Sequence, residues 1–195
     1  MQKHSATAEC FCIKKTTSMS PLELIDKYCP EERLRHILLV HSRAVADKAL
    51  EIARCHPELH ADEQFVEEAA LLHDIGIVRV DAPAIACYGT EPYICHGVLG
   101  AEILRGEGLE RHALVCERHT GTGLTLQQIV QQRLPLPLKD MQPQSIEEQI
   151  ICFADKFFSK TRLETEKSVE QARRSLEKFG AEGLVKFDAW CERFL

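Results

Sequence analysis

Apolar residues recur at helical spacing through most of the chain beyond residue 20. In the segment 30–54 they fall three or four positions apart, and this spacing puts them on one face of a 3.6-residue helix. We therefore predict a long amphipathic helix there, which carries His36 and His41. Its apolar positions are Leu34, Ile37, Leu38, Val45, Ala49, Ile52 and Ala53.

Capping signals mark the starts of further helices. Asp62 can cap a helix that ends just after the dipeptide His73-Asp74. Ser145 and Glu148 have the spacing of a capping box, and the helix that they open carries Asp155. Because no sustained period-two alternation occurs, the expected fold class is all-α, a single-domain helical bundle. Helical spacing also covers residues 20–28, 96–104, 109–119, 125–133, 168–179 and 181–193.

Three segments lack this periodicity. Residues 1–19 are polar and are expected to form a flexible tail that precedes a domain covering 20–195. Residues 80–92 contain two prolines and residues 134–143 contain three, which favours loops, since proline cannot continue a regular element. The first of these loops is expected to overhang the functional site.

Composition and charge narrow the classes of partner. The 195 residues are 45% hydrophobic and 28% charged, which is ordinary for one packed globular domain. A net charge of −6 leaves no basic surplus for a phosphate backbone, so duplex nucleic acid is not expected as a partner. No apolar run could span a bilayer and no secretion signal is evident, so we expect a cytoplasmic protein without a membrane partner. A homodimer is compatible with this composition.

The nine cysteines do not indicate a disulfide framework, because their number is odd and cytosolic thiols stay reduced. Cys10 and Cys12 form an isolated C-x-C without a second pair at zinc-ribbon spacing, so we expect no metal there. Cys152 is expected to pack in the core.

The dipeptide His73-Asp74 is the first candidate for chemistry. The apolar residues Ala69-Ala70-Leu71-Leu72 directly precede this dipeptide and place it at the end of a core helix. An unpaired carboxylate would be costly to bury there. Both side chains can lean toward one ion at a last helical turn. A bound metal would remove the cost, although one such dipeptide alone is weak evidence.

Three blocks in order carry a resemblance to a known family. They are His41-Ser42-x-x-Val45-Ala46-x-x-Ala49-Leu50, then Leu71-Leu72-His73-Asp74-Ile75-Gly76, and finally Phe153-Ala154-Asp155-Lys156. Together they resemble the HD superfamily of metal-dependent phosphohydrolases, over about residues 34–160. The resemblance implies an HD-type helical fold and one metal held by His41, His73, Asp74 and Asp155. His36 is a rival for the first ligand, but the alanine pattern that follows fits His41 better.

Two further histidines lie between the His-Asp pair and the last aspartate. His96 and His119 are similar in position to the extra ligands of two-metal members of the superfamily. The resemblance then implies that Asp74 bridges two ions and that a bridging water is the nucleophile. The alternative for each is a histidine near the site or on the surface. His112 is expected not to be a ligand.

The chain also departs from the cyclic-dinucleotide enzymes of the superfamily. Those enzymes have a lysine after the glycine of the His-Asp block, where this chain has Ile77, and their Gly-Tyr-Pro signature is absent. Cyclic dinucleotides are therefore disfavoured as substrates. Three basic side chains could bind phosphate oxygens: Lys156, Arg118 and Lys160. The candidate catalytic residues are Asp74, Lys156 and Arg118. The alternative for each basic residue is a solvated surface charge.

Three functions remain open. The first is hydrolysis of a nucleotide or another small phosphate ester, either a monoester or a diester. The second is a di-iron oxygenase, because some HD proteins with a similar ligand order activate oxygen. The third is a nucleotide-binding regulatory module without catalysis. Imidazole and carboxylate ligands suit Mn, Fe, Co, Ni and Zn alike, so the expected cofactor is a divalent transition metal, as one or two ions.

Overall fold

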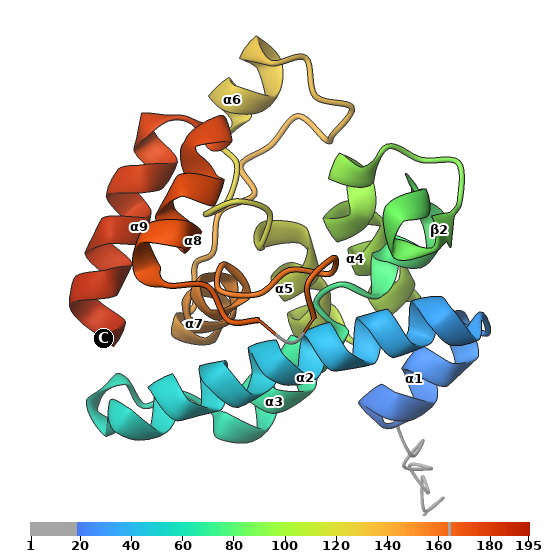
Figure 1. Cartoon of the computed structure of the whole chain (residues 1–195), viewed down its shortest axis with the longest axis horizontal. Coiled ribbons are helices and arrows are strands. Elements are labelled where there is room, and N and C mark those ends of the chain that lie inside the picture. The colour runs from blue at the N-terminus through green and yellow to red at the C-terminus, as the bar shows by residue number, and fades with distance from the viewer. Residues whose placement is uncertain (1–18, 164) are drawn as a thin grey trace, which may run out of the picture.

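The structure is a computed structural model that describes residues 19–163 and 165–195. The predicted tail, residues 1–19, lies outside this range apart from Met19, and so do Cys10 and Cys12. The described chain is helical, as the apolar spacing predicted. Its α-helices are α1 (Pro21–Tyr28), α2 (Glu32–Cys55), α3 (Glu63–Leu72), α4 (His96–Gly106), α5 (Glu110–Arg118), α6 (Leu126–Gln131), α7 (Ile146–Asp155), α8 (Val169–Leu176) and α9 (Ala181–Phe194) (Figure 1).

The helix boundaries follow local signals in the sequence. The Ser20 side chain accepts a hydrogen bond from the backbone N–H of Glu23, and the Asp62 carboxylate accepts one from Phe65, so both helices begin where a side chain satisfies a free N–H. The long helix α2 spans the predicted segment and is the axis of the fold: α3 and α7 pack against it (Figure 1). These three helices bring His41, His73 and Asp155 toward the centre.

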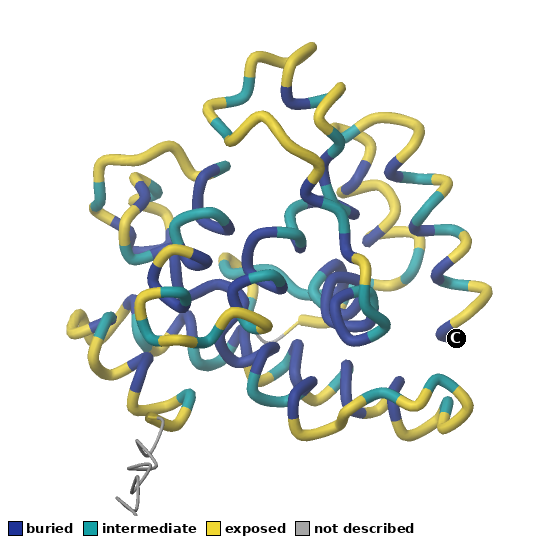
Figure 2. The backbone as a smooth tube through the Cα atoms, turned by 180° about the vertical axis from the view of Figure 1, so that it is seen from behind, coloured by how far each residue is buried: buried dark blue, intermediate teal, exposed yellow. Residues whose placement is uncertain are grey.

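Two large apolar clusters fill the interior, one along the C-terminal half of α2 and the other along its first turns. One joins α2, α3 and α7 to the C-terminal helices, where Phe153 packs against Phe187, Trp190 and Phe194. The other joins α1 and the first turns of α2 to α4 and α5. Figure 2 shows the buried residues gathered toward the middle of the molecule and the exposed ones on the outer turns. No helix in residues 19–163 and 165–195 is long and apolar enough to cross a membrane.

The segment 80–92 contains more regular structure than the loop that the prolines predicted. Strands β1 (Asp81–Ala82) and β2 (Cys87–Tyr88) pair antiparallel, with Ala82 opposite Cys87. A 3₁₀ turn, Pro83–Ile85, connects them, and Ala86 beyond it has a φ of 59°. Two-residue strands are too short to show a period of two, so the sequence pattern could not reveal them. Residues 134–143 form no helix, as predicted.

Close backbone contact sets the position of α4 against the His-Asp segment. The 3₁₀ turn Ile75–Arg79 follows Asp74, and a Cβ on Gly76 would lie 2.0 Å from the carbonyl oxygen of His96 and 2.3 Å from the backbone nitrogen of Gly100. Only glycine permits this approach. The glycine of the His-Asp-Ile-Gly block therefore brings the start of α4, with His96, beside Asp74.

Candidate metal centre

Four side chains meet at the centre of the fold, from α2, from the residues that directly follow α3, and from the end of α7. His41 Nε2 lies 3.0 Å from Asp74 Oδ2 and 3.1 Å from Asp155 Oδ1. His73 Nε2 lies 3.0 Å from the same Asp74 oxygen and 3.5 Å from Asp155 Oδ1. The ligand atoms of these four residues all lie within 4.8 Å of one another. We call His41, His73, Asp74 and Asp155 the first ligand set.

His96 and His119 form a second ligand set with the other oxygen of Asp74. Their Nε2 atoms each lie 3.5 Å from Asp74 Oδ1, and they lie 3.0 Å from each other. Both histidines are buried, and they come from opposite helix termini, since His96 begins α4 and His119 follows the last residue of α5. Asp74 therefore lies between the two sets, with one oxygen toward each.

Three of the four histidines are oriented by the same kind of hydrogen bond. The Nδ1 atom of His73 lies 2.6 Å from the carbonyl oxygen of Ala70, and those of His96 and His119 lie 2.7 Å from the carbonyl oxygens three residues earlier. A carbonyl oxygen only accepts, so Nδ1 carries the proton and donates it. In the neutral imidazole, Nε2 is then left with a lone pair directed into the cluster.

The arrangement of the lone pairs fits a divalent cation. The lone pairs of His96 and His119 face each other, and the lone pair of His73 faces carboxylate oxygens, so each pairing is between two acceptors unless a proton or metal ion is shared. Asp74 Oδ1 and the Nε2 atoms of His41 and His73 are buried without a hydrogen-bond partner. Buried acceptors of this kind carry a large free-energy cost, and a divalent ion would remove it. The residues fit a metal.

Burial and neighbouring charges shift the ionisation of the two sets in different directions. Burial opposes the charged form of His73, but Asp74 and Asp155 outweigh it and raise the pKa of His73 to about 9. Burial together with the adjacent His119 lowers the pKa of His96 to about 3. Burial also opposes ionisation of Asp74, yet Lys160 and His73 hold its pKa well below the usual range. Asp74 is therefore an anion and His96 a neutral imidazole at neutral pH, the forms that bind metals.

Two lysines after α7 lie at the cluster. The Nζ atom of Lys156 donates to Asp155 Oδ2 at 2.7 Å and to the carbonyl oxygen of His119 at 2.9 Å, so it connects the first set to the second. The Nζ atom of Lys160 lies 2.5 Å from Asp74 Oδ2. Both side chains are largely buried, with 8% and 11% of their surface exposed.

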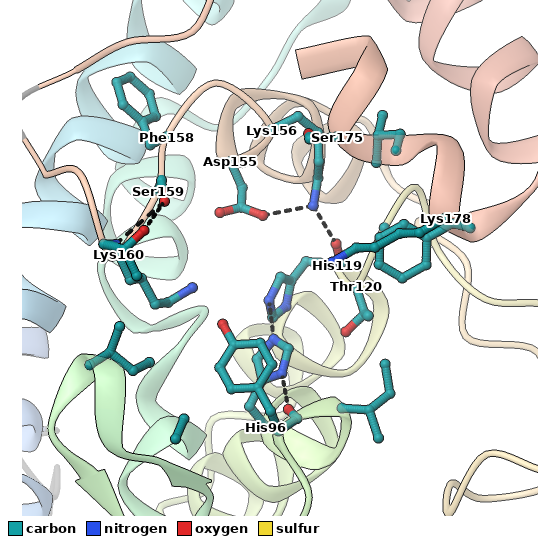
Figure 3. A pocket seen from close by; sticks show the side chains of 18 of the residues that line it. His96, His119, Thr120, Asp155, Lys156, Phe158, Ser159, Lys160, Ser175 and Lys178 are labelled. Atoms are coloured by element: carbon teal, nitrogen blue, oxygen red, sulfur yellow. Dashed lines mark hydrogen bonds and ion pairs between the residues drawn. The ribbon is translucent and has the colours of Figure 1, made fainter. Parts of the chain in front are cut away.

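A cavity of about 660 Å³ opens over the cluster and is lined by His41, His96, His119 and Asp155. This volume is in the range of small-molecule sites. Figure 3 shows Lys156, Lys160 and Lys178 around the cavity, with Lys160 and Lys178 on opposite sides. Ala82, Ala84 and Ile85 of the segment 80–92 line it as well, so this segment overhangs the site as predicted.

Some residues considered from the sequence lie elsewhere. His36 is exposed and outside both sets, whereas His41 is buried within the first. His112 lies against Glu68 and Phe65.

Arg118 does not line the cavity, because its guanidinium binds both carboxylate oxygens of Glu148, at 3.1 and 2.9 Å. Glu148 also accepts from the backbone N–H of Gln144 and not from that of Ser145, so the predicted capping box is only half formed.

The structure also adds cavity residues that the sequence did not suggest. Tyr93 stacks on the ring of His96, with centroids 4.8 Å apart, and Lys167 lines the same cavity. The turn after α8 contributes Lys178 and Phe179. Tyr93 lies three residues before His96 in the sequence, so its position beside that histidine could have been predicted. The others approach the site only through the packing of the C-terminal helices and have no local signature.

Comparison with known families matches residues 38–159 to the HD domain. This is more than half of the chain and includes all six residues of the two ligand sets. The chain belongs to the HD domain family of metal-dependent phosphohydrolases.

Several proteins share substantial sequence identity with this chain. An uncharacterized protein of Methanocaldococcus jannaschii is 35% identical over 80% of this chain and 85% of its own length. The tRNA (cytidine(56)-2'-O)-methyltransferases of Picrophilus torridus and Thermoplasma volcanium are 35% and 33% identical over 68% and 85% of this chain. The similar segments span only 34% and 44% of those two enzymes.

A solved structure is similar over most of the fold. The HD domain of the L. monocytogenes phosphodiesterase PgpH aligns with 89% of this chain and 86% of its own, with a TM-score of 0.52 and 20% sequence identity. At that identity the likeness concerns the fold, and it agrees with the all-α class expected from the sequence.

Proposed function

We propose that the protein hydrolyses a small phosphate ester, with a nucleotide as the favoured substrate, and that it uses two divalent metal ions. The observation that carries the proposal is the position of Asp74. Its Oδ2 atom faces His41 and His73, and its Oδ1 atom faces His96 and His119. One carboxylate between two imidazole pairs is the arrangement expected of a bridging ligand.

The first ligand set would hold one ion and the second set, with Asp74 in common, the other. Divalent ions at such a site lower the pKa of a bound water and stabilise the charge that develops on phosphoryl oxygens. The protein contributes the orientation of its ligands through the carbonyl contacts of His73, His96 and His119. Because these contacts are buried, the ligands are held in place before substrate arrives.

The charges around the cavity favour an anionic substrate. Among the described residues that line it, Lys156, Lys160, Lys167 and Lys178 carry positive charge and Asp155 is the single carboxylate. With metal bound, the metal would neutralise Asp74 in place of Lys160. Lys160 Nζ would then be free to donate a hydrogen bond to a phosphate oxygen. Lys156 would keep Asp155 and the backbone of His119 in place.

A nucleotide agrees with two further observations. The cavity volume exceeds what a phosphate group alone requires, and part of the lining is apolar. Two of the relatives are named as enzymes that act on a cytidine of tRNA, and each includes a segment similar to this chain. Their activity belongs to a longer chain, so it supports only the nucleotide part of the proposal.

The test combines metal analysis with an activity panel. The purified protein should contain close to two equivalents of a transition metal after loading with Mn, Fe, Co, Ni or Zn in turn. It should then release phosphate from, or cleave, at least one member of a panel of nucleoside mono-, di- and triphosphates and simple phosphate mono- and diesters. Less than a tenth of an equivalent of any metal, or full metal content with oxygen consumption and no hydrolysis, would contradict the proposal.

A further inference from the structure

Three of the partly buried apolar side chains that line the cavity share one supporting cluster. They are Ile94, Leu134 and Phe179, which we call the apolar floor. They belong to three separate segments: the 3₁₀ turn before α4, the segment after α6, and the 3₁₀ turn after α8. All three pack on one small buried cluster formed by Leu124, Ile129 and Met141.

Hydrogen bonds hold the segments of the floor together. Cys95 Sγ donates to the carbonyl oxygen of Pro135 at 3.3 Å, which joins the turn of Ile94 to the segment of Leu134. The side-chain amide of Gln128 donates to the carbonyl oxygen of Phe179, also at 3.3 Å. The apolar floor is therefore built before a ligand arrives, and a ligand would not have to order it.

The floor directly adjoins the second ligand set. Gly121 follows His119 by two residues and has a φ of 62°, and a Cβ there would lie 3.1 Å from the Phe179 ring. The glycine thus lets the Phe179 ring approach the turn that follows His119. On the other side, Tyr93 is next to Ile94 and stacks on His96. A group attached to a phosphate at the metal centre would reach the floor without a long spacer.

Phe179 lies outside the segment 38–159 that matches the HD domain. The C-terminal part of the chain thus adds an apolar surface to the cavity beside the residues of the matched segment. A sugar or a short polar group would gain little from the three floor residues themselves, because their side chains have no donors or acceptors. A planar ring would remove apolar surface from water and pack against the edge of Phe179, because Lys178 Nζ lies over the ring, 5.1 Å from its centroid, and Gly121 lies against it as well.

We infer that the apolar floor binds a planar ring in the leaving group of the substrate and that Phe179 is the residue that determines this specificity. The inference rests on the proposed function, because it takes the metal centre as the position of the phosphoryl group. It adds the class of ester: aryl-like or base-containing phosphates are favoured over alkyl and sugar phosphates.

The experiment measures binding of two non-hydrolysable probes to the metal-loaded full chain by calorimetry. Phenylphosphonate and methylphosphonate offer the same anion with and without a ring. We expect the wild type to prefer phenylphosphonate by about tenfold. Phe179→Ala should reduce this preference to less than about threefold and leave methylphosphonate affinity unchanged, because the anion does not contact the floor.

Three controls separate the ring from a general loss of structure. Phe179→Tyr keeps an aromatic ring and should keep the preference, whereas Phe179→Leu keeps much of the volume without the ring and should lose most of it. Leu138→Ala removes an apolar side chain that is 73% exposed in the neighbouring loop and should have no effect. Metal content and circular dichroism identify any variant that misfolds. If Phe179→Ala misfolds, the ring preferences of Phe179→Leu and Phe179→Tyr are compared instead.

The outcomes distinguish this inference from the function on which it rests. If both probes bind the wild type equally, the floor does not select a ring. If Phe179→Leu keeps the full preference, Phe179 does not determine the specificity. In both cases the hydrolase proposal stands. If neither phosphonate binds the metal-loaded protein, the metal centre does not bind a phosphoryl group, and both proposals are wrong.

Discussion

The two ligand sets on either side of Asp74 differ in how they are built. The first has two carboxylates and two imidazoles: His41 lies within the long helix α2, His73 and Asp74 directly follow α3, and Asp155 ends α7. The second has only Asp74 and two imidazoles, and these come from the first residue of α4 and the residue that follows α5. The first set is a site in its own right, whereas the second depends on the carboxylate that it shares.

The two ligand sets also differ in their protonation states. The pKa of His73 is raised by its carboxylate neighbours, while burial lowers the pKa values of His96 and His119. Without metal, the first set can therefore share a proton and the second is a pair of facing lone pairs. We expect the first set to bind its ion more tightly, because it provides more negative charge and more ligands.

Removing the shared carboxylate should have the largest effect. Asp74→Asn keeps the shape but removes the charge between the sets, so both ions should be lost or weakly held and turnover should fall at least about 1,000-fold. Elemental analysis and initial rates on the activity panel measure this. Asp47→Asn, which changes an exposed carboxylate on α2, is the matched control. A folded Asp74→Asn protein with near-normal rate would show that Asp74 is not the link between the sets.

Removing one imidazole of the second set should have a smaller and more selective effect. His119→Ala should lower the metal content from about two equivalents to about one and reduce the rate about 100-fold, because the first set is intact. His112→Ala removes a histidine of α5, seven residues before His119, and should change neither quantity. Unchanged metal content and rate in His119→Ala would leave a one-metal enzyme.

The two lysines should separate substrate binding from ligand positioning. Lys160→Met should raise KM about tenfold with metal content unchanged, since a charged hydrogen bond to phosphate is removed. Lys156→Met should instead lower kcat and weaken the second ion, because Lys156 holds the backbone of His119 and the carboxylate of Asp155. If both variants changed only KM, Lys156 would be a second phosphate ligand, as the sequence suggested.

The smallest effect on chemistry is expected at Arg118. It joins the end of α5, next to His119, to Glu148 on α7, and both side chains are largely buried. Arg118→Ala should lower the free energy of unfolding by about 2–3 kcal/mol, because Glu148 loses its partner, and should keep the kcat of the folded protein within about twofold. Denaturant titration and steady-state kinetics measure the two. A loss of kcat without a loss of stability would restore Arg118 as a candidate for contact with substrate.

Much of the fold could be predicted because its signals are local. The apolar spacing along 30–54 becomes α2, the Asp62 cap begins α3, and the segment with three prolines forms no helix. The short strands Asp81–Ala82 and Cys87–Tyr88 were missed, since two residues show no periodicity. Helical spacing requires only residues three and four positions apart, and a single sequence contains that information.

The sequence by itself determined the helices and the order of six residues, His41, His73, Asp74, His96, His119 and Asp155, that could bind metal. Tertiary structure decided what those residues face: which oxygen of Asp74 lies toward each histidine pair, and that Arg118 pairs with Glu148 away from the cavity. It also brought Phe179 from the C-terminal region against the turn at Gly121. Such contacts depend on how helices far apart in the chain pack together, and helical periodicity fixes the buried face of each helix but not its partner.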